Sequence, residues 1–478
     1  MFRKSLISLV AASLATSTFA YAQTPIAKVL HEFNGTDKAS PSSNLIQLPK
    51  GDFLGMTGGP TNQTTDAGAI YLLHANGSVT TLFKFAADGS QCASGAPNLT
   101  STGGALIQAS DGNIYGLCAA GGQSGNGTVF RLTPSSFTVL HSFRGSDGSY
   151  PAGALAEGLD GNLYGVTLNG GLDPEFGGTV FRVGKDGTFT TRWLFNNQTG
   201  GSNPDAGLTL GPGGNLYGMY QQYQALSGFP GPGGIYQIDK RGNVTFPAYF
   251  QAAPWGCAPV ISPKGSIVSL TQGTNFVGDG NQTLEAIPEG SSSANVVMNL
   301  PPYLDGQYVN FFGCMILAAD GLLYANGISA IYQPAHPYLE LQIDPAKRQV
   351  HFFDLGPYGM WPVLSPLEAS DGKLYIVNNG GGKYGLGNIL TLDYGLAPPR
   401  PRIATFQPAS GGVGTVVTIR GALFVGVQSV TLNGQAAPFR TMASGFIAFS
   451  VPSGATSGAI GVTTANGTAT SASTFTVQ

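Results

Sequence analysis

The chain has 478 residues, of which 71 are glycine and 31 proline, so glycine makes up about 15 % of it against an average of roughly 7 %. Turns must be frequent, and long helices rich in alanine, leucine, lysine and glutamate are excluded. Hydrophobic residues (42 %) and aromatic residues (10 %) are sufficient for a core, which excludes a disordered chain. Charged residues are only 10 % and the net charge is −3, so the sequence excludes nonspecific attraction to nucleic acid.

The first 22 residues have the pattern of a signal peptide. Arg3 and Lys4 precede an apolar run from Leu6 to Ala15, and Ala20-Tyr21-Ala22 has the small-x-small pattern of a cleavage site. We expect cleavage near Ala22 and a secreted or periplasmic protein. The run is too short to cross a bilayer, and no later stretch approaches the roughly 18 residues needed, so no membrane span is expected.

Residues 23–396 consist of repeats. A turn glycine recurs about every 50 residues, at Gly51, Gly112, Gly161, Gly214, Gly265, Gly321 and Gly372. Each unit contains four short apolar or β-branched stretches separated by Gly, Asp and Asn, which predict four antiparallel strands. Four-stranded units repeated at this spacing are typical of a β-propeller, so the sequence predicts an all-β protein with a seven-bladed propeller.

The last repeat contains only three of the expected strands. The missing strand has a match at the start of the mature chain, where Lys28–Phe33 (KVLHEF) resembles Thr138–Phe143 (TVLHSF). We therefore expect the N-terminal strand to pair into the last blade and to close the ring, which would otherwise expose a sheet edge.

Four cysteines in an exported chain allow three disulfide pairings. Cys257 and Cys314 occupy nearly the same place in successive repeats, which favours a bond between them and leaves Cys92 to pair with Cys118. The spacing of cysteine and histidine fits no zinc or redox motif, so a structural role is expected for all four.

A second domain is expected after a Pro-rich connector at residues 397–401. All 25 acidic residues lie at or before Asp393, and the last four basic residues, Arg400, Arg402, Arg420 and Arg440, follow it. The propeller therefore carries a net charge of −9 and the tail +4. Alternating apolar stretches and turns such as Asn433-Gly434 predict a small immunoglobulin-like β-sandwich over residues 402–478.

These motifs resemble known families. The unit D-G-N-[IL]-Y-G, G-G, G-T-V-F-R and L-x-x-F, clearest at 106–143 and 155–195, resembles the GloVer-type tandem repeat of exported bacterial proteins. The stretch from Pro401 to Gly421 resembles an IPT/TIG domain, which has an immunoglobulin-like fold. The resemblance implies the fold and leaves the activity open, because folds host many functions.

The sequence predicts no catalytic, metal or cofactor site. His31, His141 and His351 share one repeat position on the fourth strands of different blades, so they are expected to be structural. The recurrent Asp-Gly pairs suit hairpin turns, and the tyrosines that follow them suit packing between blades. Calcium-binding and phosphate-binding loop motifs are missing.

Variable loops should gather on one face, where the second hairpins and the links between blades emerge. Aromatic residues are frequent there and charges few, which suits stacking on a polysaccharide or contact with a protein. The candidate ligand-binding residues are Tyr220, Tyr223, Trp255, Tyr303, Tyr308, Tyr332, Tyr338, Tyr358, Trp361 and Tyr384. The sequence thus favours a non-catalytic recognition or adhesion protein of the cell envelope or exterior, with the C-terminal domain as spacer or attachment module.

Two alternatives remain open. A secreted glycoside hydrolase or lyase would need two suitably spaced carboxylates on the same face. The candidates for such a pair are Asp173, Glu175, Asp205, Asp279, Asp305 and Asp354. A purely structural envelope protein is the other alternative, because every feature above also serves stability.

Overall fold

The computed structural model describes residues 24–36, 40–58, 68–92, 105–173, 177–196, 201–204, 207–224, 229–254, 258–262, 264–272, 282–300, 303–304, 307–310, 314–329, 338–358, 360–362 and 365–478. The regular secondary structure of the described chain is β-strand, apart from one short 3-10 helix, η1 (Pro212–Gly214). No helix in these segments is long and apolar enough to cross a membrane. The predicted signal peptide at residues 1–22 lies outside the described residues.

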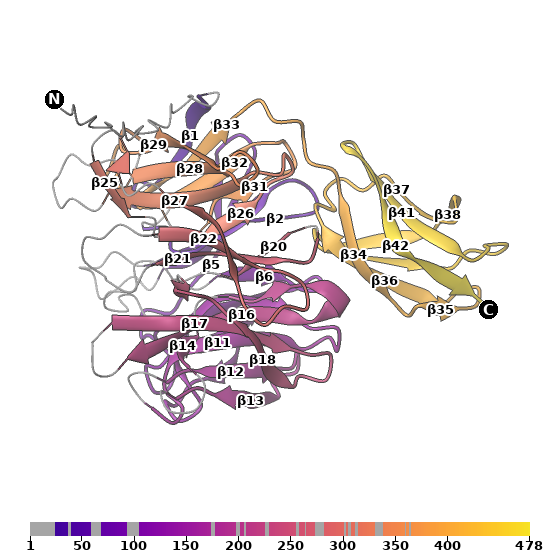
Figure 1. The fold of residues 1–478 in the computed structure, drawn as a ribbon. Helices are drawn as coiled ribbons and strands as arrows, with labels where there is room; N and C mark the ends of the chain where they lie inside the picture. The colour runs from indigo at the N-terminus through magenta and orange to yellow at the C-terminus, as the bar shows by residue number, and fades with distance from the viewer. Residues whose placement is uncertain are drawn as a thin grey trace, which may run out of the picture.

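Seven antiparallel sheets follow one another along the chain up to Asp393 (Figure 1). The first three are regular four-stranded meanders. The first sheet contains β2 (Ile46–Gln47), β3 (Phe53–Thr57), β4 (Ala69–Leu73) and β5 (Val79–Lys84). The second contains β6 (Leu106–Gln108), β7 (Ile114–Cys118), β8 (Thr128–Leu132) and β9 (Phe137–Ser142). The third contains β10 (Ser149–Glu157), β11 (Leu163–Asn169), β12 (Thr179–Val183) and β13 (Phe189–Leu194).

The next three sheets follow the same order, but their first strand is divided. The fourth contains β14 (Ser202–Pro204), β15 (Thr209–Leu210), β16 (Leu216–Gln224), β17 (Phe229–Ile238) and β18 (Val244–Tyr249). The fifth contains β19 (Ala253–Pro254), β20 (Val260–Ile261), β21 (Ile267–Gln272), β22 (Gln282–Ile287) and β23 (Asn295–Asn299). The sixth contains β24 (Tyr303–Leu304), β25 (Gln307–Asn310), β26 (Met315–Leu317), β27 (Leu323–Ser329), β28 (Tyr338–Asp344) and β29 (Gln349–Asp354).

The seventh sheet joins the two ends of the repeat region. It contains β30 (Met360–Pro362), β31 (Leu367–Glu368), β32 (Leu374–Gly380) and β33 (Asn388–Asp393), and its outer strand is the N-terminal β1 (Ile26–Glu32). Strand β1 pairs with β33 from Ile26 opposite Asp393 to Glu32 opposite Asn388. The expected pairing of the N-terminal strand with the last repeat is therefore confirmed.

Phe33 follows β1 and is completely buried, like Phe143 at the matching place in the second sheet. His31 meets the Phe33 ring edge-on with the ring centroids 4.7 Å apart, and His141 meets Phe143 in the same way at 5.0 Å. The repeated histidine position therefore serves packing, as its repetition predicted.

Adjacent sheets share hydrophobic cores. Buried clusters join the first sheet to the second, and so on through to the sixth and seventh. A further cluster contains Phe53 and Tyr71 of the first sheet together with Tyr375 and Ile389 of the seventh. The first and seventh sheets thus pack on each other like consecutive ones.

The C-terminal domain is a sandwich of two sheets around its own core, which includes Val417, Ile419, Ile447 and Phe449. One sheet contains β34 (Arg402–Gln407), β36 (Val416–Ala422), β40 (Phe446–Ser450) and β39 (Phe439–Ala443). The other contains β35 (Ser410–Gly411), β42 (Gly467–Val477), β41 (Gly458–Thr464), β37 (Ser429–Leu432) and β38 (Gln435–Ala437). This is the predicted immunoglobulin-like fold.

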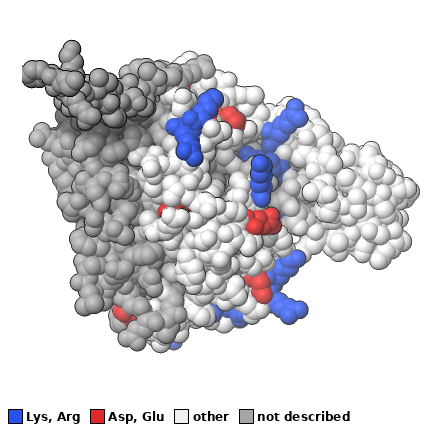
Figure 2. All heavy atoms as spheres, in the orientation of Figure 1, with Lys and Arg blue, Asp and Glu red and all other residues white. Residues whose placement is uncertain are grey.

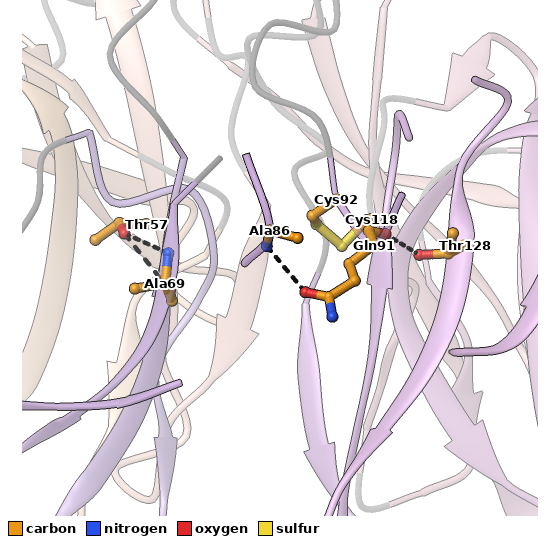
Figure 3. Close-up of a disulfide and its surroundings, with 7 residues drawn as sticks. All are labelled: Thr57, Ala69, Ala86, Gln91, Cys92, Cys118 and Thr128. Carbon is orange, nitrogen blue, oxygen red and sulfur yellow. Dashed lines mark hydrogen bonds between the residues drawn. A yellow bond between two sulfur atoms is a disulfide. The ribbon is translucent and has the colours of Figure 1, made fainter. Parts of the chain in front are cut away.

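A disulfide connects Cys92, after β5, with Cys118 at the end of β7, with a Cα–Cα distance of 5.4 Å (Figure 3). The neighbouring Gln91 accepts a hydrogen bond from the Ala86 amide at 2.9 Å through its side chain, and its carbonyl accepts one from Thr128 Oγ1 at 2.8 Å. The Cys92–Cys118 prediction is confirmed. Cys314 is also disulfide-bonded, and Cys257, its expected partner, lies outside the described residues.

Candidate functional site

The sheets have two different ends. The turn between the first and second strands lies at one end, which we call the turn end and which carries the recurrent glycines from Gly51 to Gly372. The second hairpin lies at the opposite end, which we call the loop end. Because sheets are regular between these ends, the two ends are where the repeat can carry a function.

At the turn end, an aspartate holds each regular turn together. Asp111 accepts hydrogen bonds from the Asn113 amide at 3.1 Å and from the Tyr115 hydroxyl at 2.8 Å. Burial acts to raise the pKa of Asp111, but the bonds from Tyr115 and Asn113 outweigh it and hold the pKa below its usual value. Burial and the bond to Asp160 raise the pKa of the equivalent Tyr164 to about 12.

The same pair of side chains recurs in two more sheets. The Tyr324 hydroxyl donates to Asp320 at 2.8 Å, and the Tyr375 hydroxyl donates to Asp371 at 3.1 Å. The sequence predicted separate turn and packing roles for these residues and missed the bond between them. The signal was present, because the aspartate and the tyrosine are always four residues apart. These carboxylates are therefore engaged in structure.

The C-terminal domain packs against the turn end (Figure 1). The Gly426 amide donates to the Pro49 carbonyl of the first sheet at 2.9 Å. Gln407 Nε2 donates to the Leu159 carbonyl of the third sheet at 3.0 Å, and Asn466 Nδ2 donates to the Ser370 carbonyl of the seventh at 2.6 Å. The C-terminal domain is therefore docked on the repeat region through hydrogen bonds to three of its sheets.

A small cavity of about 100 Å³ lies within this interface, between the third sheet and strands β34, β36 and β40. Glu157 lines it and forms an ion pair with Lys185 at 2.8 Å. Arg420 also lines it, is 9 % exposed and lies over the Phe446 ring, 5.2 Å from its centroid. Burial lowers the pKa of Arg420, while the charges of Glu157 and Asp160 oppose that shift.

Two arginines of the C-terminal domain, Arg402 and Arg420, thus lie near carboxylates of the repeat region. Arg402 Nη2 lies 3.7 Å from Glu368 Oε2, in addition to the pairing of charge around Arg420. On the side drawn in Figure 2, charged side chains lie along the junction of the two domains, and the outer part of the C-terminal domain is uncharged. Part of the opposite charge of the two regions is therefore brought together at the contact between the two domains. Among the described residues, no group of three His, Cys, Asp or Glu side chains could hold a metal ion.

At the loop end, two loops have the same backbone. Residues 121–127 (GGQSGNG) and 381–387 (GGKYGLG) each contain four glycines with positive φ. In both loops, the first glycine accepts a hydrogen bond from the last glycine amide, at 3.0 Å and 3.2 Å respectively. The shared glycines fix the loop and leave the third and fourth positions free to vary.

These variable positions are exposed. They hold Gln123 and Ser124 in the second sheet, and Lys383 and Tyr384 in the seventh. Tyr384 is 50 % exposed, and Lys383 Nζ lies 5.1 Å from the centroid of its ring. In the third sheet Leu172, at the corresponding end, is 64 % exposed. Apolar and polar side chains are therefore presented side by side on a fixed backbone.

The ten aromatic candidates divide into four groups: one is exposed, one lies in the core, two are partly buried, and the side chains of six lie outside the described structure. Tyr384 is exposed at the loop end. Tyr220 is only 3 % exposed and packs in the core against Phe195 and Phe246, because β16 continues to Gln224 and keeps Tyr220 inside the sheet. Its expected place in a loop is therefore wrong.

Tyr338 and Tyr358 are partly buried against the core between the sixth and seventh sheets. Tyr358 stacks on Phe353 with the ring centroids 6.0 Å apart. Trp255 and Tyr332 lie outside the described residues, as do the side chains of Tyr223, Tyr303, Tyr308 and Trp361.

Of the six loop carboxylates considered for catalysis, Asp173 and Asp354 belong to the described residues. They lie in the third and sixth sheets, and Asp354 accepts a hydrogen bond from the Gly356 amide at 2.7 Å. Glu175, Asp205, Asp279 and Asp305 lie outside the described residues. The described structure therefore brings no candidate acid pair together.

Comparisons with known sequences agree with the two regions. Residues 101–329 match the Gloeobacter/Verrucomicrobia repeat, and residues 401–477 match the IPT/TIG domain. Both resemblances expected from the motifs are confirmed. No curated protein matches the chain significantly.

Solved structures are similar at low identity. A fungal alcohol oxidase of the AA5 family, in complex with copper, is 15 % identical with a TM-score of 0.48, over 92 % of this chain and 100 % of that one. A PL25 ulvan lyase bound to a saccharide is 11 % identical with a TM-score of 0.47, over 74 % and 94 %. A protein of unknown function from Dyadobacter fermentans is 12 % identical with a TM-score of 0.39, over 61 % and 94 %.

Proposed function

We propose that this chain, a Gloeobacter/Verrucomicrobia repeat region followed by an IPT/TIG domain, is an exported, non-catalytic recognition or adhesion protein. Its seven sheets would be the blades of one closed propeller. The loop end would bind a polysaccharide or a protein at the cell envelope or outside the cell.

The contacts between sheets support the closed ring. Each sheet shares a buried cluster with the next, and the seventh shares one with the first through Phe53, Tyr71, Tyr375 and Ile389. Hydrogen bonds add to this cluster, because Gln47 of the first sheet accepts one from the Ser370 amide of the seventh at 2.9 Å. A ring needs such a contact between its two ends, whereas an open array of sheets does not.

The observation that carries the proposed function is the difference between the two ends. The IPT/TIG domain packs on the turn end, and among the described residues exposed side chains such as Tyr384 lie at the loop end. Its glycine-fixed loops lose little conformational freedom on binding, which favours affinity. Tyr384 offers a ring for stacking, and amide and hydroxyl groups such as those of Gln123 and Ser124 offer hydrogen bonds.

A glycan-array and polysaccharide pull-down screen tests this proposal, using residues 23–478 and mass spectrometry of every sugar that binds. We expect retention without cleavage, and a reduction of about tenfold in affinity for Tyr384→Ala. Leu82→Ala is the matched control, because Leu82 is 47 % exposed but lies on the outer strand β5.

Cleavage of a bound sugar would instead support the hydrolase or lyase alternative. If no sugar binds, a polysaccharide ligand is excluded, and a protein partner or a structural role is left. Equal losses of affinity in Tyr384→Ala and Leu82→Ala would contradict the loop end as the binding surface.

A further inference from the structure

The sixth sheet differs from the other six at the centre of its second hairpin. In the other sheets the two residues facing each other there are apolar and at most 5 % exposed: Met56–Ile70, Leu117–Val129, Val166–Val180, Met219–Ile235, Leu270–Leu284 and Val377–Ile389. In the sixth sheet the same place holds Asn326 opposite Glu340. A polar pair thus replaces an apolar one at a single point of the repeat.

Glu340 is completely buried, and within the described part of the chain neither of its carboxylate oxygens has a hydrogen-bond partner. The buried glutamate of the fifth sheet provides a direct contrast. Glu285 accepts bonds from the Gln251 amide at 2.8 Å and from Thr271 Oγ1 at 2.9 Å. Two glutamates in neighbouring sheets are therefore equally buried, but only Glu285 has donors that stabilise a negative charge.

Among the described neighbours of Glu340, no basic side chain is placed to neutralise a charge. In the other sheets the central pair packs toward the next sheet along the chain, and around Glu340 the interface with the seventh sheet contains Leu390 and Leu392. The titratable groups that interact with Glu340 are the phenols of Tyr324 and Tyr394, whose ring centroids lie 5.4 Å apart. Behind them, Asp320 accepts the Tyr324 hydroxyl and adds a further negative charge.

Burial raises the pKa of Glu340 well above its usual range, and no basic side chain among the described residues opposes that shift. A carboxyl group in this position is buried at least cost as the neutral acid. On its own strand, Tyr338 also has a raised pKa because it is partly buried, so it is neutral as well. The interface is therefore built around an uncharged form of Glu340.

We propose that Glu340 is a proton-dependent switch in the packing of the sixth sheet on the seventh. With a proton, the acid fits between the two sheets. When the proton is lost, the unpaired carboxylate draws water, and the strands β27 and β28 separate from the seventh sheet. The device is independent of the ligand-binding proposal, because it requires no ligand.

The sign of the pH dependence follows from linkage. The unfolded chain releases the Glu340 proton at a lower pH than the folded chain does. The contribution of the protonated Glu340 to the stability of the fold is therefore complete below the pKa of the unfolded chain, and it is lost as the pH rises toward the pKa of the folded chain. Over that window this one group should raise the unfolding equilibrium constant about tenfold per pH unit.

The test compares urea unfolding of the full mature chain from pH 4.5 to pH 9 for wild type, Glu340→Gln and the double variant Asn326→Leu/Glu340→Leu, which copies the Leu270–Leu284 pair of the fifth sheet. In both variants, we expect the pH dependence of the free energy of unfolding to lack the contribution of one proton that wild type shows. Both variants should also be more stable than wild type at pH 8. Glu285→Gln is the matched control, and it should be less stable than wild type across the whole range.

A second measurement does not depend on a variant's stability. Infrared spectra of the wild-type chain at pH 7 should contain the C=O band of a buried carboxylic acid, and hydrogen exchange in β27 and β28 should accelerate with pH beyond the intrinsic rate. Parallel pH profiles of wild type and Glu340→Gln would overturn the proposal. Stabilisation of wild type, but not of Glu340→Gln, by Na⁺ or Ca²⁺ would also overturn it, because a cation and not a proton would then occupy the site.

Discussion

The turn end and the loop end of the repeat region are built from the same seven units, yet they differ in what varies. At the turn end the aspartate and tyrosine recur and form a hydrogen bond with each other, as in Asp111 and Tyr115. The IPT/TIG domain packs against this end of the sheets. At the loop end of the second and seventh sheets the glycines recur while the residues between them change, as in Gln123-Ser124 and Lys383-Tyr384. Uniform side chains therefore support a fixed interface, and a uniform backbone supports variable side chains.

The largest effect is expected from the disulfide beside the loop end. Replacement of Cys92 and Cys118 by serine opens a link across 26 residues and should lower the free energy of unfolding by about 3 kcal/mol. Urea unfolding with and without a reducing agent measures this change. Reduction also opens the disulfide of Cys314, so the two proteins are compared with both reduced. If the reduced double serine variant were then less stable than reduced wild type, the loss would come from packing and not from the cross-link.

The next largest effect is expected from the substitution of a loop glycine. In Gly127→Ala a Cβ would lie 2.4 Å from Pro151 Cδ, on a backbone with φ of +100°, and we expect a loss of about 2–3 kcal/mol in urea unfolding. Gly125→Ala in the same loop is the control, because its φ is also positive but nothing lies within 4 Å of the added carbon. Equal losses would mean that the contact with Pro151 does not fix this loop.

At the turn end, Tyr115→Phe removes the hydroxyl that donates to Asp111 and should cost about 1–1.5 kcal/mol near pH 7. Tyr217→Phe is the control, since Gly213 takes the place of the aspartate in the fourth sheet, and its effect should be close to zero. Chemical unfolding of both variants checks the difference, and a loss in Tyr217→Phe as large as in Tyr115→Phe would contradict the role of the aspartate.

The cost of Tyr115→Phe should also depend on pH. The pKa of Asp111 is lowered in the folded chain, so its contribution is present above the unfolded value of about 3.9 and is lost as the pH falls through the folded value. The difference between wild type and Tyr115→Phe should therefore shrink in acid. A difference that stays constant from pH 7 to pH 2 would argue against a bond to the charged carboxylate.

The smallest effect is expected from the charge pair between the domains. Arg402 is half exposed and lies 3.7 Å from Glu368, so Arg402→Gln should cost less than about 1 kcal/mol and the loss should decrease at high salt. Thermal unfolding at low and high ionic strength measures it. A larger loss that salt does not reduce would indicate that packing, and not charge, holds the domain at this point.

Much of the fold could be predicted from the sequence because repetition makes weak signals visible. One Asp-Gly turn says little, but its return every 50 residues predicted the sheets, and the match of Lys28–Phe33 to Thr138–Phe143 predicted the pairing of β1 with β33. The docking of the IPT/TIG domain was not predicted. The charge difference between the two regions pointed to it, but a net charge does not say where Arg402 and Arg420 lie.

The site was predicted less well because a loop cannot be bounded from composition. Tyr220 looked like a loop residue, since glycine and glutamine surround it, but β16 continues beyond it and buries its ring. Glu340 was overlooked because a single glutamate in a strand is unremarkable until its register shows that six other sheets have an apolar residue there.

The most direct test of the central claim is hydrogen exchange of the full mature chain with and without a ligand found in the glycan-array and polysaccharide pull-down screen. We expect protection of residues 121–127 and 381–387 and no change at the turn end or in the IPT/TIG domain. Protection confined to the turn end or to the IPT/TIG domain would contradict the loop end as the recognition surface.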